Sequence, residues 1–104
     1  MNIDVTGKVI VVTGAAQGIG RTLAMGLAAD GARVAVLARD RERAQLVVDE
    51  IAGEAIALAA DVSREDEVIA AAAEVDATWG RVDALINNAG WMPGSHPVLD
   101  VEVS

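Results

Sequence analysis

Cysteine, phenylalanine and tyrosine are all absent from this 104-residue chain, whose aromatic residues are two tryptophans. Without cysteine the chain can form no disulfide, no thiolate metal site and no cysteine nucleophile. Its apolar residues, 53% of the total, are mainly Ala, Val, Leu and Ile. Small and branched side chains suit the packing of helices on a parallel sheet, whose buried strands favour Val and Ile. The composition therefore favours an α/β protein.

Basic residues are scarce, because 8 Lys and Arg stand against 16 Asp and Glu and give a formal net charge of −8. An acidic surface repels phosphodiester backbones, so the charge argues against a nucleic-acid partner. It still leaves room for a local anion site, since a helix N-terminus and a single arginine act at short range.

Long apolar runs are also absent. No run in the sequence approaches the ~20 residues that a membrane span needs. The segment Met1–Lys8 carries Asp4 and has no apolar stretch behind a basic one, so it does not resemble a signal peptide. We therefore expect a soluble, cytoplasmic protein without a membrane partner.

Short β-branched runs alternate along the chain with stretches of helical periodicity. The predicted strands cover residues 8–12, 34–38, 55–60 and 84–86, and helical periodicity spans residues 18–30, 44–51 and 63–80. The order β-α-β-α-β-α-β implies a parallel sheet with right-handed crossovers and helices on its faces. The pattern stops after Gly90, and residues 98–104 are too few to classify.

Apolar spacing predicts which face of each helix is buried. The three predicted stripes are Ile19, Leu23, Ala24, Leu27 and Ala28; then Ala44, Val47, Val48 and Ile51; then Val68, Ala72, Val75 and Trp79. Gly31 is expected to end the first helix in a left-handed conformation. Ser63 occupies the expected N-cap position of the third helix, ahead of an acidic first turn.

The strongest motif lies between the first predicted strand and the first predicted helix, where residues 13–20 are Thr-Gly-Ala-Ala-Gln-Gly-Ile-Gly. Glycines let the backbone bend sharply and approach a ligand where a Cβ would collide. The helix that follows points free N–H groups at the turn, which suits a pyrophosphate. An ordinary glycine-rich turn is the alternative, but the order strand, glycines, helix favours nucleotide binding.

The spacing Gly-x-x-x-Gly-x-Gly differs from the Gly-x-Gly-x-x-Gly of the commoner dinucleotide-binding fold. It resembles the Thr-Gly-x-x-x-Gly-x-Gly fingerprint of the short-chain dehydrogenase/reductase family. Two further family features are matched by Asp61-Val62 after the third predicted strand and by residues 87–90, Asn-Asn-Ala-Gly, at the end of the fourth. The resemblance runs from Thr6 to the last residue. It implies a Rossmann-like α/β fold that binds a nicotinamide dinucleotide.

The resemblance assigns a pyrophosphate-binding turn to the first motif. It implies that Gly14, Gly18 and Gly20 line this turn, that Gln17 lies within it, and that Ile19 offers its backbone to the cofactor.

The resemblance also assigns contacts to the adenosine half of the cofactor. Asp61 and Val62 are expected to flank the adenine. Asn87, Ala89 and Gly90 are expected to border the adenosine ribose and the way to the nicotinamide. For Asp61 an alternative remains open, because a helix-capping or plain surface carboxylate would also suit this position.

The end of the second predicted strand separates the two nicotinamide cofactors, because proteins that prefer NAD place a carboxylate there for the ribose hydroxyls. Here that position is Ala38, followed by Arg39. An arginine gives a charge-assisted, bidentate contact to a 2′-phosphate, so Arg39 favours NADP(H) over NAD(H). Two observations keep the choice open. Asp40 and Arg41 follow at once, as in a solvated helix start, and Gln17 is neutral where phosphate-preferring family members often carry a basic residue.

His96 is the single histidine of the chain. With no cysteine or second histidine beside it, the sequence indicates no metal site, and we interpret His96 as a bystander in a Pro/Gly-rich loop. Trp91 and Met92 follow residues 87–90, near where substrates of the family approach. A substrate pocket and ordinary packing explain these two side chains equally well.

The catalytic residues that the resemblance implies are missing from these 104 residues. The family passes a proton through a tyrosine, aided by a lysine four residues later, a serine and an asparagine on the next helix. Because the chain contains no tyrosine, no catalytic residue is assigned. We expect an incomplete dinucleotide-binding domain over residues 1–104, a sheet truncated after the fourth strand, and a family oligomer interface that is largely missing.

Two functions are compatible with the sequence. The first is the N-terminal portion of an NAD(P)-dependent short-chain oxidoreductase, which transfers a hydride between the nicotinamide cofactor and an alcohol or carbonyl substrate. The alternative is a catalytically inert dinucleotide-binding module or a non-functional truncated product. A downstream Tyr-x-x-x-Lys with a serine before it would support the enzyme.

Overall fold

Alternating strands and helices make up the structure, a computed structural model that describes residues 4–14, 18–87 and 100–103. In chain order the elements are β1 (Val9–Thr13), α1 (Gly18–Ala29), β2 (Arg33–Ala38), α2 (Arg41–Glu50), β3 (Ala55–Ala59), α3 (Glu65–Trp79), β4 (Ala84–Asn87) and β5 (Asp100–Val103). The predicted order up to β4 is confirmed, with strand ends that differ by at most one residue.

The sheet has the strand order β3-β2-β1-β4-β5. The first four strands are parallel, as predicted, and β5 lies antiparallel to β4. The parallel part of the sheet ends at β4, as expected, but the sheet itself continues with the antiparallel β5. The register of β5 runs from Ala84↔Val103 to Asn87↔Asp100, so β5 pairs with backbone groups that β4 would otherwise expose.

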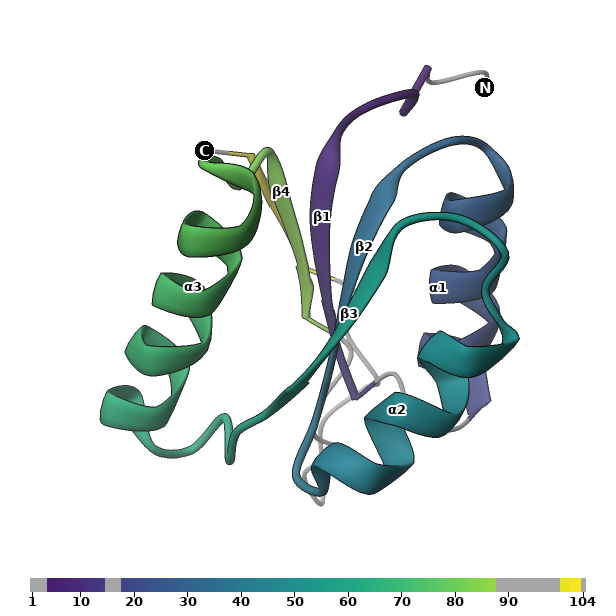
Figure 1. The fold of residues 1–104 in the computed structure, drawn as a ribbon. Coiled ribbons are helices and arrows are strands. Elements are labelled where there is room, and N and C mark those ends of the chain that lie inside the picture. Colours follow the sequence, from purple (N-terminus) through teal and green to yellow (C-terminus); the bar gives the residue numbers. More distant parts are fainter. Residues whose placement is uncertain (1–3, 15–17, 88–99, 104) are drawn as a thin grey trace.

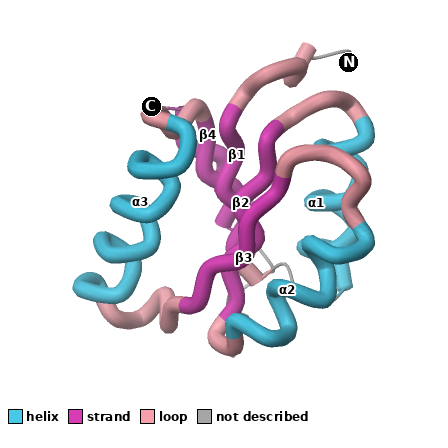
Figure 2. Tube along the Cα trace, viewed as in Figure 1, coloured by secondary structure: helices cyan, strands magenta, loops and turns pink. Residues whose placement is uncertain are grey.

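Helices cover both faces of the sheet, with α1 and α2 on one side and α3 on the other (Figures 1 and 2). All five residues of β1 are buried. Ile10 and Val12 belong to the cluster packed under α1 and α2, whereas Val9 and Val11 belong to the cluster under α3. Because strand side chains alternate between faces, a strand covered on both sides is apolar throughout.

The structure corrects one position in each of two predicted helix stripes. The other residues predicted for α1 are buried or packed against the core, namely Leu23, Ala24, Leu27 and Ala28. In α1 the buried residues are Gly20 and Ala24, whereas Ile19 is 61% exposed. The small residues Gly20 and Ala24 face the sheet and allow α1 to approach it closely. With this side of the helix turned to the sheet, Ile19 faces solvent. In α3, Val75 is buried as predicted, but its buried neighbour is Ala71 rather than Ala72. The end of α1 is as predicted, since Gly31 has a φ of 94°.

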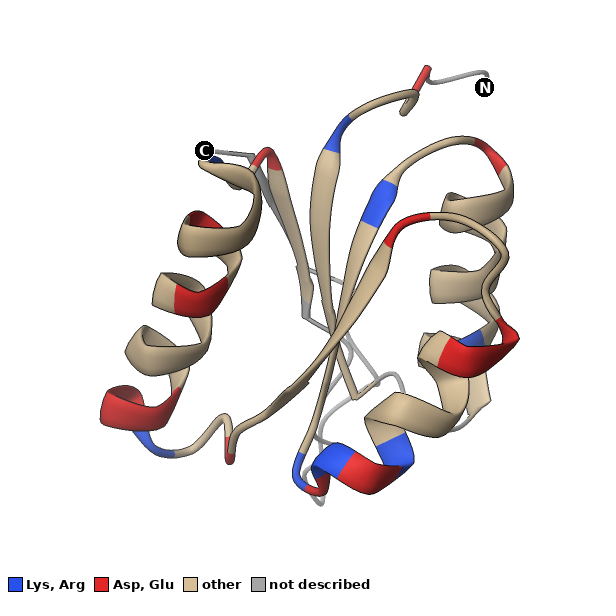
Figure 3. Cartoon of the chain, viewed as in Figure 1, with Lys and Arg blue, Asp and Glu red and all other residues tan. Residues whose placement is uncertain are grey.

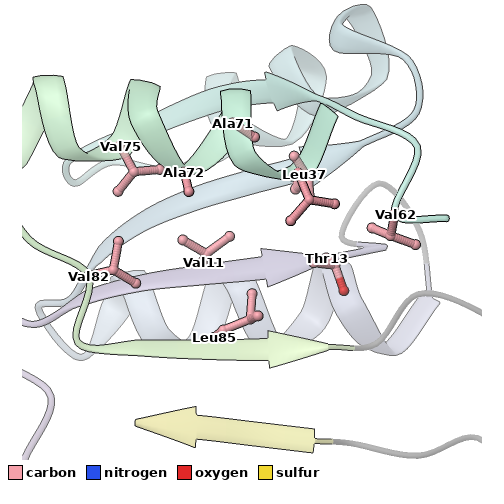
Figure 4. Close-up of a pocket in the computed structure, with 10 residues that line it drawn as sticks. Val11, Thr13, Leu37, Val62, Ala71, Ala72, Val75, Val82 and Leu85 are labelled. Carbon is pink, nitrogen blue, oxygen red and sulfur yellow. The ribbon is translucent and has the colours of Figure 1, made fainter. Parts of the chain in front are cut away.

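Among the described elements, α3 alone covers its face of the sheet, and a cavity of about 200 Å³ lies between this helix and the sheet (Figure 4). Its lining is apolar except for Thr13. The lining residues are Val11, Thr13, Leu37, Val62, Val68, Ala71, Ala72, Val75, Val82 and Leu85.

The outer edge of the sheet at β3 is closed by Arg41 from the start of α2. Its guanidinium donates to the carbonyl oxygen of Ala57 at 3.2 Å and to Glu74 Oε1 of α3 at 3.0 Å. Arg41 thus links the helical layers on the two faces and satisfies a carbonyl on an edge strand, where unpaired groups invite pairing with another chain.

Asp83 joins the amino ends of β1 and β4. Its Oδ2 accepts from the Val9 N–H at 2.8 Å, and its own N–H donates to the Val9 carbonyl at 2.8 Å. Arg81 donates to the other carboxylate oxygen through its guanidinium. The Arg81 hydrogen bonds, followed by that from Val9, hold the pKa of Asp83 below its ordinary value of 3.8.

No helix in the described ranges combines the length and apolar character needed to cross a bilayer.

Leu58 tests the core under α3, because its side chain is only 1% exposed. Leu58→Ala should lower the free energy of unfolding by about 2–5 kcal/mol, through lost burial and the cavity left behind. The control is Leu46→Ala on α2, where the side chain is 65% exposed and the change should stay within about 0.5 kcal/mol. Urea denaturation of the two variants measures both values, and similar losses would contradict this description of the core.

Asp83→Asn tests the β1–β4 connection through its pH dependence. A carboxylate whose pKa is lower in the folded state stabilises the fold above its unfolded pKa, and this contribution disappears as pH falls through the folded pKa. The variant should therefore be less stable than the wild type at pH 7, and the difference should shrink below pH 3.8. Urea denaturation across that range measures it, and a constant difference would contradict the role of the ionised carboxylate.

Candidate functional site

The predicted site residues that the structure describes gather at the carboxyl edge of the parallel sheet. At this edge Thr13 of β1 is in register with Leu37 of β2 and with Asn87 of β4. Gly14 follows β1, Arg39 follows β2, and Asp61 and Val62 follow β3. Parallel strands all end at one edge, which is where open α/β sheets bind ligands.

Several predicted residues are not placed by the structure. For Asn87 the structure gives the backbone position at the end of β4 only. Outside the described residues lie Gln17, Ala89, Gly90, Trp91, Met92 and His96.

The glycine motif combines two turn positions with one packing position. Gly14 and Gly18 both have a φ of 62°, a left-handed conformation that glycine adopts without strain. A Cβ added at Gly18 would meet no atom of the described residues within 4 Å, and Gly18 itself is exposed. Gly20 lies within α1 and is buried. The motif therefore combines two left-handed turn positions with a small buried residue that lets α1 pack close to the sheet.

The helix ends at this edge differ in charge. The first turn of α1 carries no acidic residue, whereas that of α2 holds Glu42 and that of α3 holds Glu65, Asp66 and Glu67. Figure 3 shows the acidic segments at the starts of α2 and α3. Carboxylates already occupy the positive ends of α2 and α3, so α1 is the helix suited to an external anion.

Thr13, which opens the motif, has a structural role that was not predicted from the sequence. The side chain is 4% exposed, and its hydroxyl donates to the Ile86 carbonyl at 3.4 Å. This contact joins the ends of β1 and β4, one residue before Gly14.

Asp61 is held in place by its own turn. Its Oδ1 accepts from the Ser63 hydroxyl at 2.7 Å and from the Ser63 N–H at 3.0 Å, and its N–H donates to Glu67 Oε1 at 2.9 Å. The prediction that Ser63 is the N-cap of α3 is therefore wrong. Arg64 occupies that position without a side-chain capping bond, because the Ser63 hydroxyl bonds to Asp61 instead.

Glu67 was expected only as part of the acidic first turn of α3, and neither its bond to the Asp61 N–H nor the bonds of Ser63 to Asp61 were predicted. The signal is Asp-x-Ser before a helix with a glutamate in its first turn, which is typical of a side-chain-bonded turn.

These contacts fix the charge of Asp61. The hydroxyl of Ser63, then its N–H, and then the charges of Arg39 and Arg64 hold the pKa of Asp61 below its ordinary value of 3.8. The carboxylate is therefore ionised at neutral pH. Asp61 does not cap α3, whose N-cap is Arg64, and it is not a plain surface carboxylate, because its Oδ1 accepts two bonds from Ser63. These bonds to a single oxygen are compatible with ligand binding.

Arg39 is the most loosely held of the paired arginines. Its side chain is 82% exposed, and its Nη2 lies 3.9 Å from Asp61 Oδ1. Asp40, not Arg39, caps α2, since its carboxylate accepts from the Glu42 N–H. Closer ion pairs, all within 3.1 Å, join Arg21 to Glu50, Arg33 to Glu54, Arg41 to Glu74, Arg64 to Glu67 and Arg81 to Asp83.

Val62 stands at the end of the cavity nearest this edge, together with Thr13 and Leu37 (Figure 4). Its side chain is 40% exposed. An apolar surface thus lies beside the ionised carboxylate of Asp61, an arrangement that suits a flat base with a polar rim.

A family model described as short chain dehydrogenase matches residues 8–104. The chain belongs to the short-chain dehydrogenase/reductase family. Its Rossmann-like α/β fold agrees with that of solved members. A 3-ketoacyl-(acyl-carrier-protein) reductase from Brucella melitensis, complexed with NADH, superimposes with a TM-score of 0.79 and 43% identity over 83% of this chain and 36% of its own.

Curated members of the family are similarly close. A 3beta-hydroxysteroid dehydrogenase from Mediterraneibacter gnavus is 39% identical over 91% of this chain and 36% of its own length. An L-fucose dehydrogenase from Oryctolagus cuniculus is 40% identical over 89% of this chain and 31% of its own length. The chain thus spans about a third of the length of the curated relatives it matches.

Gly18→Ala tests the exposed, left-handed glycine at the start of α1. The substitution places a methyl group beside the start of α1 and strains a residue with a φ of 62°, a cost of about 1–2 kcal/mol. We expect the affinity for NADH to fall about tenfold or more, as fluorescence titration would measure. The control is Gly26→Ala in the middle of the same helix, where an added Cβ also meets no described atom within 4 Å. This variant should bind NADH with unchanged affinity. Equal affinities of the two folded variants would contradict the assignment.

Proposed function

We propose that residues 1–104 are the dinucleotide-binding domain of an NAD(P)-dependent oxidoreductase, and that they prefer NADP(H) to NAD(H). In the whole protein, the bound cofactor would exchange a hydride with an alcohol or carbonyl substrate. The observation that carries the proposal is the exposed, left-handed Gly18 at the start of α1, whose first turn lacks a carboxylate, on the same sheet edge as Arg39.

The pyrophosphate fits the glycine turn. Gly14 and Gly18 leave the backbone accessible, and the first N–H groups of α1 provide donors for a charged group. We assign Gln17 to the same turn and the backbone of Ile19 to the pyrophosphate, while Gly20 acts by letting α1 pack close to the sheet. Ile19 is the second residue of α1, where backbone N–H groups have no partner within the helix, so its N–H is available as a donor to the pyrophosphate.

The adenosine half fits the ends of β2, β3 and β4. Asp61 and Val62 offer a carboxylate and an apolar surface to the adenine. Residues 87–90, of which Asn87 ends β4 and Ala89 and Gly90 follow, are assigned to the ribose and the path toward the nicotinamide.

The preference for NADP(H) depends on Arg39. No carboxylate stands at Ala38 to repel a 2′-phosphate, and the loosely paired guanidinium of Arg39 is free to turn toward one. A guanidinium can bind phosphate in a bidentate manner. Because the Brucella melitensis reductase was crystallised with NADH, the shared fold accepts a dinucleotide without the phosphate. The choice therefore falls to side chains at the strand ends.

We infer that the choice of substrate depends chiefly on residues outside this part of the chain. The relatives named above are a hydroxysteroid dehydrogenase, a fucose dehydrogenase and a ketoacyl reductase, yet each is about 40% identical to this chain. Since proteins with such different names share this part, it supplies the cofactor site that they have in common.

A catalytically inert dinucleotide-binding module is the second candidate for these 104 residues alone. The absence of tyrosine favours it, since the family resemblance gives the proton transfer to that residue. Downstream sequence with Tyr-x-x-x-Lys would favour the enzyme.

Arg39→Ala tests the cofactor preference. Loss of a charge-assisted contact should raise the Kd for NADPH about tenfold, while the Kd for NADH should change little. The matched control is Arg33→Ala, which removes the same charge at the opposite end of β2. Fluorescence titration of both cofactors measures the four values. If Arg39→Ala weakens both cofactors equally, the preference does not come from Arg39.

A further inference from the structure

One carboxylate oxygen is shared by a serine and an arginine at the ends of β2 and β3. Asp61 Oδ1 accepts both hydrogen bonds from Ser63 and lies 3.9 Å from Arg39 Nη2. The Asp61 side chain is 32% exposed and held by its turn, whereas that of Arg39 is 82% exposed. The carboxylate is therefore the fixed partner of this pair and the guanidinium the one that can turn away.

The other charged groups nearby are engaged elsewhere. Arg41 binds Ala57 and Glu74, and Arg64 pairs with Glu67 at 3.1 Å. Asp40 caps α2. Within the described part of the chain, Asp61 is the carboxylate that competes directly for the guanidinium of Arg39.

A 2′-phosphate at Arg39 would meet this competition. Such a phosphate carries a charge of about −1.5 to −2 at neutral pH, and it would draw the guanidinium away from Asp61 while standing near an ionised carboxylate. A ribose hydroxyl at the same place does neither. The charge of Asp61 therefore opposes the phosphorylated cofactor selectively.

We propose that Asp61 is an intramolecular competitor for Arg39 and thereby lowers the preference for 2′-phosphorylated dinucleotides. This inference rests on the proposed function, since it requires Arg39 to bind the 2′-phosphate. Any contact of Asp61 with the adenine is common to both cofactors, so it cancels in the ratio of their affinities.

Asp61→Asn tests the proposal, because asparagine keeps an acceptor for the Ser63 donors and removes the charge. The ratio of the Kd for NADH to that for NADPH should rise on the order of two- to fivefold, as expected for an exposed ion pair. The rise should shrink in the Arg39→Ala background. The matched control, Glu54→Gln, removes a carboxylate at the opposite edge and should leave the ratio unchanged.

The outcomes separate the two proposals. If Arg39→Ala alone leaves the ratio unchanged, the assignment of the 2′-phosphate to Arg39 fails. If that variant lowers the ratio but Asp61→Asn does not raise it, or raises it equally with and without Arg39, the competition is overturned.

A measurement on the wild-type chain does not depend on the folding of any variant. Carbon-13 NMR of the Asp61 carboxyl gives its pKa with adenosine 2′,5′-bisphosphate or adenosine 5′-monophosphate bound. With the bisphosphate the pKa should be higher, because the carboxyl loses Arg39 and gains a neighbouring anion. Ser63 and Arg64 are the same in both complexes. Equal pKa values would overturn the proposal.

Discussion

The parallel register of β1 with β2 and β4 is the constraint on which the site depends, because it sets strand ends from distant parts of the chain side by side. The apolar pattern of β1 does not specify this register, since Val9–Val12 is buried on both faces and a one-residue shift would still bury apolar side chains. Polar contacts at the two ends do specify it. Asp83 holds Val9 at one end, and Thr13 bonds to Ile86 at the other.

Placement of acidic residues reconciles the net charge of −8 with a site for an anionic cofactor. The carboxylates of α2 and α3 lie in their first turns, where they stabilise the positive ends of these helices. The first turn of α1 has none, and glycines surround it. The electrostatics that a ligand meets is therefore set within one helix turn, and the overall charge is a poor guide to it.

The strands could be predicted from the sequence because each is a short, continuous apolar run. The alternation of strands with helices along the chain predicted that the first four strands are parallel. The pairing of β5 could not, since four residues, Asp-Val-Glu-Val, give too short a pattern to name a partner. Periodicity placed Ile19 on the buried stripe because it does not fix how far α1 is rotated over the sheet. The capping role given to Ser63 failed because serine can bond either to a helix N–H or to a neighbouring carboxylate, and only the turn geometry decides.

Cofactor selectivity is a difference between two affinities, so a residue can set it by weakening one of them. Motifs in the sequence identify groups that attract a ligand, such as the glycine turn and Arg39. Sequence motifs do not identify a carboxylate that already pairs with this arginine in the absence of the ligand. Asp61 and Arg39 are separated in the sequence by a helix and a strand, and they meet only at the sheet edge. A preference inferred from Arg39 alone would therefore overstate the attraction to phosphate. The neighbouring strand end has to be included, and the parallel register determines which residue stands there.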